Sequence, residues 1–228
     1  MNYNNLLTWD QAVKSKHPNL SVVLGVVSNI KNTVWNPILE ELKQKTIQRI
    51  LENYTLENIK EEPTTRSYRD FYWRIGIDPT KIRPAGEALV RRVLSKKPFP
   101  RISPAVDAYN LASVETLIAL SGYDYNKLLF PLNIRFASPQ DMFKGIGMSD
   151  YEKLKGNELI VSDKEKIICV YPYRDSELSK IESNTTKILI LGYGVPGISL
   201  DKVFSAVEKA CMNIKTVCGG EIGLIEIL

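Results

Sequence analysis

Residues 71–128 decide the predicted fold: FYWRIGIDPTKIRPAGEALVRRVLSKKPFPRISPAVDAYNLASVETLIALSGYDYNKL. A Gly-Ile-Asp-Pro turn leads to Pro84, and a proline in the first helical turn gives up no hydrogen bond. Ser103 can cap a second helix that begins at Pro104. We therefore predict helices from Pro84 to about residue 96 and from Pro104 to about residue 120. A loop, Gly-Tyr-Asp-Tyr at 122–125, should stop the second helix.

On both sides of this stretch, the apolar spacing alternates between helical and strand periods. Before it, residues 20–27 (LSVVLGVV) predict a buried strand, and Asn36-Pro37 predicts the start of a helix that runs to about residue 54. A shorter helix is expected over 66–74. Residues 132–137, 159–161, 166–171 and 187–191 predict strands, and residues 201–211 predict an amphipathic helix. A helix-rich first half and a strand-rich second half indicate an α+β fold with an antiparallel sheet.

Size and composition are those of a soluble globular protein. Of the 228 residues, 44% are hydrophobic and 25% are charged, and no apolar run approaches the length of a membrane span. The three cysteines form no disulfide framework and have no histidine near them, so we expect a cytoplasmic protein without a metal site. The only histidine, His17, lies in a polar stretch next to a proline, which makes a Ser–His–Asp or Cys–His enzyme improbable. The glycines at 192–197 lack the Lys-Ser/Thr of a phosphate loop, so no nucleotide cofactor is expected.

The basic residues are concentrated in one segment. Seven basic residues and one acidic residue lie between Lys81 and Arg101, a net charge of +6 that leaves −2 for the rest of a chain whose total is +4. A localised basic face is typical of proteins that bind polyanions, although a solvated helix face that serves solubility has the same pattern. We expect the following residues to contact an RNA backbone: Arg83, Arg91, Arg92, Lys96 and Lys97.

These motifs together resemble the editing domain of the β subunit of bacterial phenylalanyl-tRNA synthetase, and especially its free-standing relatives. The resemblance covers residues 65–200 and is most specific in 71–128. It is carried by Gly76, Asp78, Pro79, Arg83, Pro84, Glu87, Ala88, Leu89, Arg91, Arg92, Pro104, Val106, Asp107, Asn110, Gly122, Tyr123, Asp124, Lys127 and Leu128. It implies an α+β fold with an antiparallel β-sandwich-like core and flanking helices. We expect residues 65–228 to form this editing-like, tRNA-binding domain and residues 1–64 to form an α/β extension packed on it.

Two polar residues, Asp107 and Asn110, lie among apolar residues on the predicted 104–120 helix. A buried polar group without a partner costs about 1–3 kcal/mol, so both need partners. They could tie a neighbouring loop to the helix through backbone groups, or they could line a substrate pocket. Both interpretations predict damage on mutation, but only the second predicts lost activity in a folded variant.

The loop at 173–176 is a second candidate site. The synthetase domain has a glycine-rich loop and an important carboxylate in this region, whereas this chain has Arg174, Asp175 and Ser176. Arg174 could hold a phosphate or carboxyl group, Asp175 could accept from an α-amino group or orient a water, and Ser176 could donate to an ester oxygen. A surface Arg–Asp pair with a turn serine is the alternative.

The loop at 122–125 is a third candidate, with Tyr123 and Asp124 as substrate-binding residues. The synthetase domain has a histidine here that helps to tell tyrosine from phenylalanine, and this chain has none. Aromatic core packing and a turn aspartate would explain the same residues.

The resemblance implies a protein that handles charged tRNA without charging it. We expect a free-standing deacylase that binds the aminoacylated acceptor end and hydrolyses a mischarged ester without a cofactor, with Asp175 and Ser176 as the catalytic residues. A non-catalytic module of the same fold that binds tRNA, another RNA or an amino acid is the first alternative. A protein–protein adaptor that uses the exposed aromatic run Phe71-Tyr72-Trp73 is the second.

Overall fold

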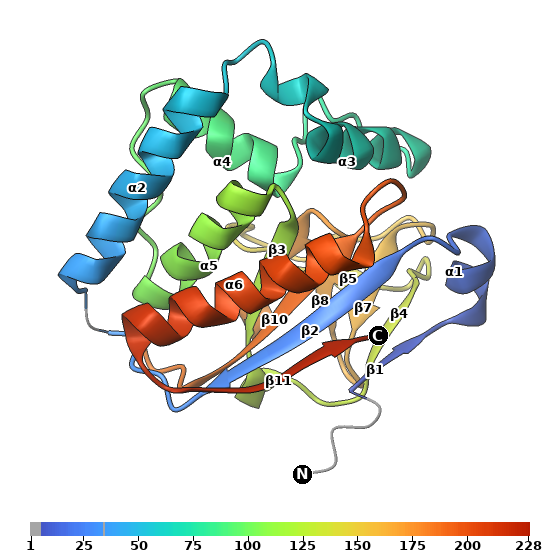
Figure 1. Cartoon of the computed structure of the whole chain (residues 1–228). Helices are drawn as coiled ribbons and strands as arrows, with labels where there is room; N and C mark the ends of the chain where they lie inside the picture. Colours follow the sequence, from blue (N-terminus) through green and yellow to red (C-terminus); the bar gives the residue numbers. More distant parts are fainter. Residues whose placement is uncertain (1–5, 34) are drawn as a thin grey trace.

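Two β-sheets lie face to face and form the core of the protein, with helices on the outer side of one sheet (Figure 1). The computed structural model describes residues 6–33 and 35–228. One continuous cluster of buried apolar side chains joins both sheets and the helices. None of the helices in these ranges is long and apolar enough to cross a bilayer.

The first sheet contains the strands β11 (Glu221–Ile227), β2 (Ser21–Ser28), β10 (Lys187–Gly194) and β3 (Ala119–Asp124), in that order. All neighbouring strands are antiparallel. The inner strands β2 and β10 are covered on both faces, which explains why their sequences are nearly continuous apolar runs.

The second sheet contains the strands β1 (Leu7–Trp9), β4 (Leu132–Phe136), β7 (Leu159–Ser162), β8 (Ile167–Val170) and β9 (Arg174–Asp175), in that order. β1 pairs with β4 in parallel, and the remaining pairs are antiparallel. A small hairpin of β5 (Met142–Phe143) and β6 (Glu152–Lys153) packs on the outer side of this sheet through a cluster that includes Phe143, Ile160 and Ile167.

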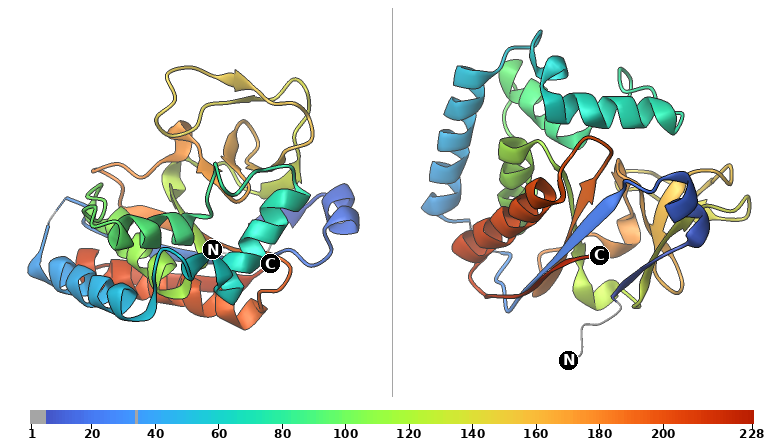
Figure 2. Two further views of the ribbon diagram at one scale, coloured as in Figure 1. Left: turned by 90° about the horizontal axis from the view of Figure 1, so that it is seen from above. Right: turned by 45° about the vertical axis from the view of Figure 1, so that its right-hand side comes forward.

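The helices are α1 (Gln11–Lys16), α2 (Pro37–Asn53), α3 (Pro63–Arg74), α4 (Ala85–Leu94), α5 (Pro104–Thr116) and α6 (Leu200–Cys218). Helices α5 and α6 lie on the first sheet, and α2 and α4 lie beyond them, whereas α3 lies over one end of the sheet, where Tyr68 contacts Ala119 and Tyr193 (Figures 1 and 2). The predicted N-caps are present: Asn36 accepts from the amide of Leu39 at 3.0 Å, and Ser103 accepts from the amide of Val106 at 3.4 Å.

Helix α6 approaches the first sheet closely because glycines lie beneath it. A Cβ atom on Gly192 would lie 2.5 Å from a methyl group of Val207, and a Cβ on Gly25 would lie 2.6 Å from the sulfur of Cys211. The side chain of Tyr193, next in β10, therefore points to the opposite face, toward the second sheet.

The α+β class and the sandwich-like core with flanking helices are confirmed. The predicted loop at 122–125 is wrong, because residues up to Asp124 form the buried strand β3. Helix α5 ends at Thr116, where Leu117 takes a φ of 60°. Gly122 is needed inside the strand, since a Cβ there would lie 2.6 Å from the ring of Tyr109 on α5.

The division at residues 64 and 65 stays a prediction. Within the structure, β2 occupies an inner position of the first sheet, and its residues Val22 to Leu24 are fully buried. The first segment therefore supplies part of the core in addition to the helix α2 that lies outside it.

We predict that Gly192→Ala destabilises the protein by about 1–3 kcal/mol, because the added methyl group overlaps Val207. Gly223→Ala in β11 is the control, since its Cβ would meet no heavy atom closer than 3.8 Å. Urea unfolding of both variants measures the difference. Equal free energies of unfolding would contradict the close helix–sheet contact.

Candidate functional site

Two edge strands bring Tyr123 and Asp175 together. β3 is the last strand of the first sheet and β9 is the last strand of the second. The hydroxyl of Tyr123 donates to Oδ1 of Asp175 at 2.7 Å, which links the sheets at this edge. Tyr123 is fully buried, and Asp175 is a half-buried residue at the end of the inter-sheet layer, where its carboxyl group is itself shielded from solvent.

A line of hydrogen bonds continues from this pair into the protein. The hydroxyl oxygens of Tyr123 and Tyr193 lie 2.8 Å apart, and Sγ of Cys169 lies 3.3 Å from the hydroxyl of Tyr193. A phenol has one proton, so when Tyr123 donates to Asp175, Tyr193 must donate to Tyr123 and the thiol must donate to Tyr193. Every donor in the line therefore points toward the carboxylate, and aligned donors strengthen one another.

Burial governs the protonation of these groups. It raises the pKa of the Asp175 carboxyl group to about 6, although hydrogen bonds from Tyr123 and Ser121 act in the opposite direction. It raises the pKa of the Cys169 thiol to about 12, so this cysteine is neutral and poorly nucleophilic. Tyr123, whose pKa is raised well above its ordinary value by burial and by Asp175, remains a donor.

Asp107 lies apart from this cluster. Its side chain is fully buried on α5, accepts from the amide of Ile102 at 2.9 Å and pairs with Nζ of Lys43 from α2 at 2.8 Å. These contacts tie the loop before α5, and the helix α2, to α5. Burial raises the pKa of Asp107, while Lys43 and Ile102 oppose the rise. Asn110 is half-buried on the same helix, and a substrate-binding role for either residue stays a prediction.

The other predicted site residues have separate partners. Asp124 is buried and accepts from the hydroxyl of Thr185 at 2.7 Å and from the amide of Asn126. Arg174 is exposed and donates to the carbonyl of Ile146 at 3.1 Å. These contacts stabilise turns, so the structure does not join either side chain to the Tyr123–Asp175 pair.

Ser176 follows Asp175, but its side chain is oriented away from the inter-sheet layer. It is only 1% exposed, donates to the carbonyl of Lys144 at 3.3 Å and accepts from the amide of Leu178 at 3.2 Å. It thereby caps the short helix Glu177–Ser179. A catalytic role of Ser176 stays a prediction that this geometry does not favour.

The predicted basic face is smaller than the sequence suggested. Arg91 was expected to contact an RNA backbone, but it is half-buried and pairs at 2.7 Å with Glu87, which is 1% exposed and also pairs with Arg69 at 3.1 Å. The single negative charge of Glu87 is shared by two guanidinium groups, so it offsets the charge of Arg91 only in part. The four remaining cations are exposed and make no ion pair with the described residues: Arg83, Arg92, Lys96 and Lys97.

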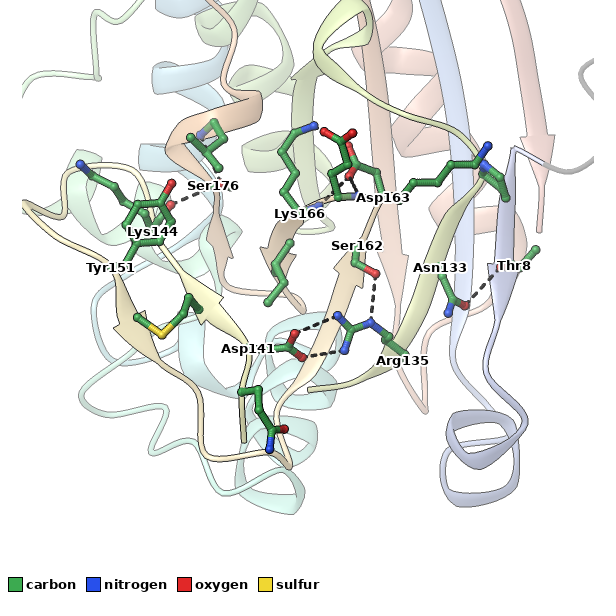
Figure 3. Close-up of a pocket in the computed structure, with 17 residues that line it drawn as sticks. Thr8, Asn133, Arg135, Asp141, Lys144, Tyr151, Ser162, Asp163, Lys166 and Ser176 are labelled. Atoms are coloured by element: carbon green, nitrogen blue, oxygen red, sulfur yellow. Dashed lines mark hydrogen bonds and ion pairs between the residues drawn. The ribbon is translucent and has the colours of Figure 1, made fainter. Parts of the chain in front are cut away.

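A pocket of about 750 Å³ lies on the outer side of the second sheet, beneath the β5–β6 hairpin (Figure 3). We call it the outer pocket. Its lining includes Arg135, Asp141, Lys144, Tyr151, Asp163, Lys164, Lys166 and Ser176. The sequence analysis missed it, because its residues come from five strands and the loops between them, with no shared motif. Within residues 6–33 and 35–228, no group of three His, Cys, Asp or Glu residues could hold a metal ion.

Comparison with known proteins agrees with this architecture. A family model described as the B3/4 domain matches residues 67–219. The chain belongs to the B3/4 domain family. Its sequence is 24% identical over 144 residues to a phenylalanine–tRNA ligase beta subunit of Haemophilus ducreyi, an alignment that covers 53% of this chain and 18% of that protein. This B3/4 chain therefore corresponds to less than a fifth of that relative's length.

A solved structure has a similar fold. It is the N-terminal fragment of the phenylalanyl-tRNA synthetase beta-subunit from Pyrococcus horikoshii, which matches with a TM-score of 0.51 and covers 95% of this chain and 49% of that chain. The sequence identity is 14%, so this likeness concerns the fold alone. The predicted relationship to a domain of the phenylalanyl-tRNA synthetase β subunit is thus confirmed.

We predict that Asp175→Asn stabilises the protein relative to wild type as the pH rises. The folded-state pKa of about 6 exceeds the ordinary 3.8, so the native state binds the proton more tightly and loses stability as pH rises through 6. The loss amounts to at most about 3 kcal/mol. Asparagine does not titrate and keeps an oxygen for Tyr123.

Urea unfolding at pH 4.5 and pH 7.5 measures this effect. The free-energy difference between Asp175→Asn and wild type should grow with pH, whereas the exposed control Asp70→Asn on α3 should show no such growth. A difference for Asp175→Asn that does not change with pH would show that the carboxyl group titrates normally.

Proposed function

We propose that this B3/4 domain binds the acceptor end of aminoacyl-tRNA and hydrolyses the ester of mischarged tRNA in trans. The sequence relative named above is a subunit of an enzyme that joins phenylalanine to tRNA, which supports charged tRNA as the ligand class. The exposed cations Arg83, Arg92, Lys96 and Lys97 support a phosphate-rich partner, because such residues contact backbones without reading bases.

The Asp175 carboxyl group is the observation on which the catalytic part rests. It is kept half-buried at a cost in stability, at the edge where the two sheets meet, with a pKa of about 6. A perturbed carboxyl group in such a position is a candidate for function, because a purely structural role would not require the cost. Above pH 6 it is a carboxylate.

A carboxylate here can perform two tasks for an aminoacyl ester. It can accept a hydrogen bond from the α-amino group of the substrate, or it can orient a water toward the carbonyl carbon. The donor line from Tyr193 and Tyr123 stabilises the negative charge of Asp175 and fixes the rotamer of the carboxylate. An activated ester needs little more than positioning of the water, so a site without a histidine or cysteine nucleophile suffices.

The deacylation test uses wild-type protein and a panel of mischarged tRNAs. Asp175→Asn should lower kcat by about 10²-fold or more, with tRNA affinity unchanged. Wild-type activity should rise with pH through about 6, because the ionised carboxylate is the active form. The control Asp70→Asn should retain full activity. Absence of amino-acid release above buffer from every charged tRNA would exclude the hydrolase.

The basic residues are tested separately by binding. The double variant Lys96→Gln/Lys97→Gln should weaken tRNA binding and reduce the slope of log affinity against log salt by about 2, because two phosphate contacts are lost. The charge-matched control is Lys14→Gln/Lys31→Gln, at two exposed lysines elsewhere. Equal salt slopes for the two double variants would show that this face does not contact RNA.

A non-catalytic binding module is the second candidate. It is favoured by the packing of Tyr123 and Tyr193, which are both fully buried and fill the inter-sheet layer behind Asp175. Salt-dependent tRNA binding by wild type without any turnover would establish this alternative.

A further inference from the structure

The outer pocket lies on the other side of β9 from the Asp175 cluster. Asp175 points toward Tyr123 between the sheets, while the next residue, Ser176, lines the outer pocket. Neighbouring residues of an extended chain point to opposite faces, so the two sites are separated by one strand. A ligand bound in the outer pocket would therefore not need to contact Asp175.

The floor of the outer pocket is held rigid by its own hydrogen bonds. The guanidinium of Arg135 contacts both carboxylate oxygens of Asp141, at 2.6 and 3.2 Å, and its Nε donates to the hydroxyl of Ser162 at 3.1 Å (Figure 3). Lys166 pairs with Asp163, which also accepts from the amides of Leu129, Glu165 and Lys166. These charges are matched within the floor, so they position the pocket and leave little capacity for a ligand.

The rim of the pocket is different. Lys144 and Lys164 make no ion pair with any described carboxylate, and a single exposed acid, Glu165, also lines the pocket. Tyr151 is 50% exposed, and Nζ of Lys144 lies 6.0 Å from the centre of its ring. Thr8 and Asn133 add hydroxyl and amide groups at the opposite side (Figure 3).

We propose that the outer pocket binds a nucleotide unit, with its phosphate near Lys144 and its base stacked on Tyr151. An exposed aromatic ring beside cations is the combination with which proteins bind the nucleotides of single strands. The volume of about 750 Å³ falls within the range of small-molecule sites. This proposal goes beyond the proposed function and does not depend on ester hydrolysis.

The test is a titration of the isotope-labelled full chain, monitored by amide chemical shifts. The probes are adenosine and cytidine 5′-monophosphates, the corresponding nucleosides and a short single-stranded oligoribonucleotide. Nucleotides should shift amides of the outer pocket, and nucleosides should bind more weakly because they lack the phosphate. Similar affinity for monophosphate and oligonucleotide identifies a free nucleotide as the ligand, whereas much tighter oligonucleotide binding identifies an RNA strand.

Variants separate this site from a general charge effect. Lys144→Ala and Tyr151→Ala should each weaken binding about tenfold, and Tyr151→Phe should retain it because the ring remains. Lys153→Ala is the matched control, since Lys153 is exposed on the same hairpin and does not line the pocket. Asp175→Asn should leave nucleotide binding unchanged even if it abolishes deacylation. Absence of shifts in the pocket, or equal effects of Lys144→Ala and Lys153→Ala, would overturn the proposal.

Discussion

The hydrogen bond between the Tyr123 hydroxyl and the Asp175 carboxyl group is the contact on which the candidate site depends. It joins the edge strands of the two sheets, which are also held together by apolar packing and by the contacts of Tyr193 with Cys169 and of the Tyr171 hydroxyl with the carbonyl of Gly194. Tyr193 and Cys169 continue the line of donors. The hydroxyl and thiol protons of this line therefore point toward the Asp175 carboxyl group. The layer accordingly favours a negative charge at a position where burial alone disfavours it.

The opposing effects of burial and of the hydrogen-bond donors on the pKa of Asp175 suit a functional role. Burial raises the pKa of Asp175 to about 6, and the donors limit the rise, so the group is ionised at neutral pH without being fully solvated. Carboxyl groups whose pKa values are raised by burial are concentrated in active sites. Asp107 and Glu87, by contrast, are fully buried and have cationic partners. Their ion pairs stabilise the packing of helices, which explains both carboxylates as structural residues.

Local signals in the sequence predicted much of the fold, because caps and periodic apolar runs depend only on neighbouring residues. Asn36 and Ser103 mark helix starts, and the apolar runs of β2 and β10 mark inner strands. Gly122 was misread as a helix stop because its requirement for a small side chain comes from Tyr109 on another element.

The sites, too, depend on contacts between distant residues that local sequence signals do not show. The resemblance directed attention to Tyr123 and Asp175, but the sequence could not show that the two side chains meet, since they lie 52 positions apart. Glu87 had the spacing of an exposed ion pair with Arg91, and only the position of Arg69 on α3 explains its burial. The outer pocket depends on the path of the β5–β6 hairpin over the second sheet, which no local pattern specifies.

The most direct test is an NMR titration of the Asp175 side-chain carboxyl carbon, assigned by comparison with Asp175→Asn. An inflection near pH 6, together with a wild-type deacylation rate that rises over the same pH range, is the result we predict. An inflection near the ordinary aspartate value of about 3.9 would contradict the view that the sheet edge holds a perturbed, functional carboxyl group.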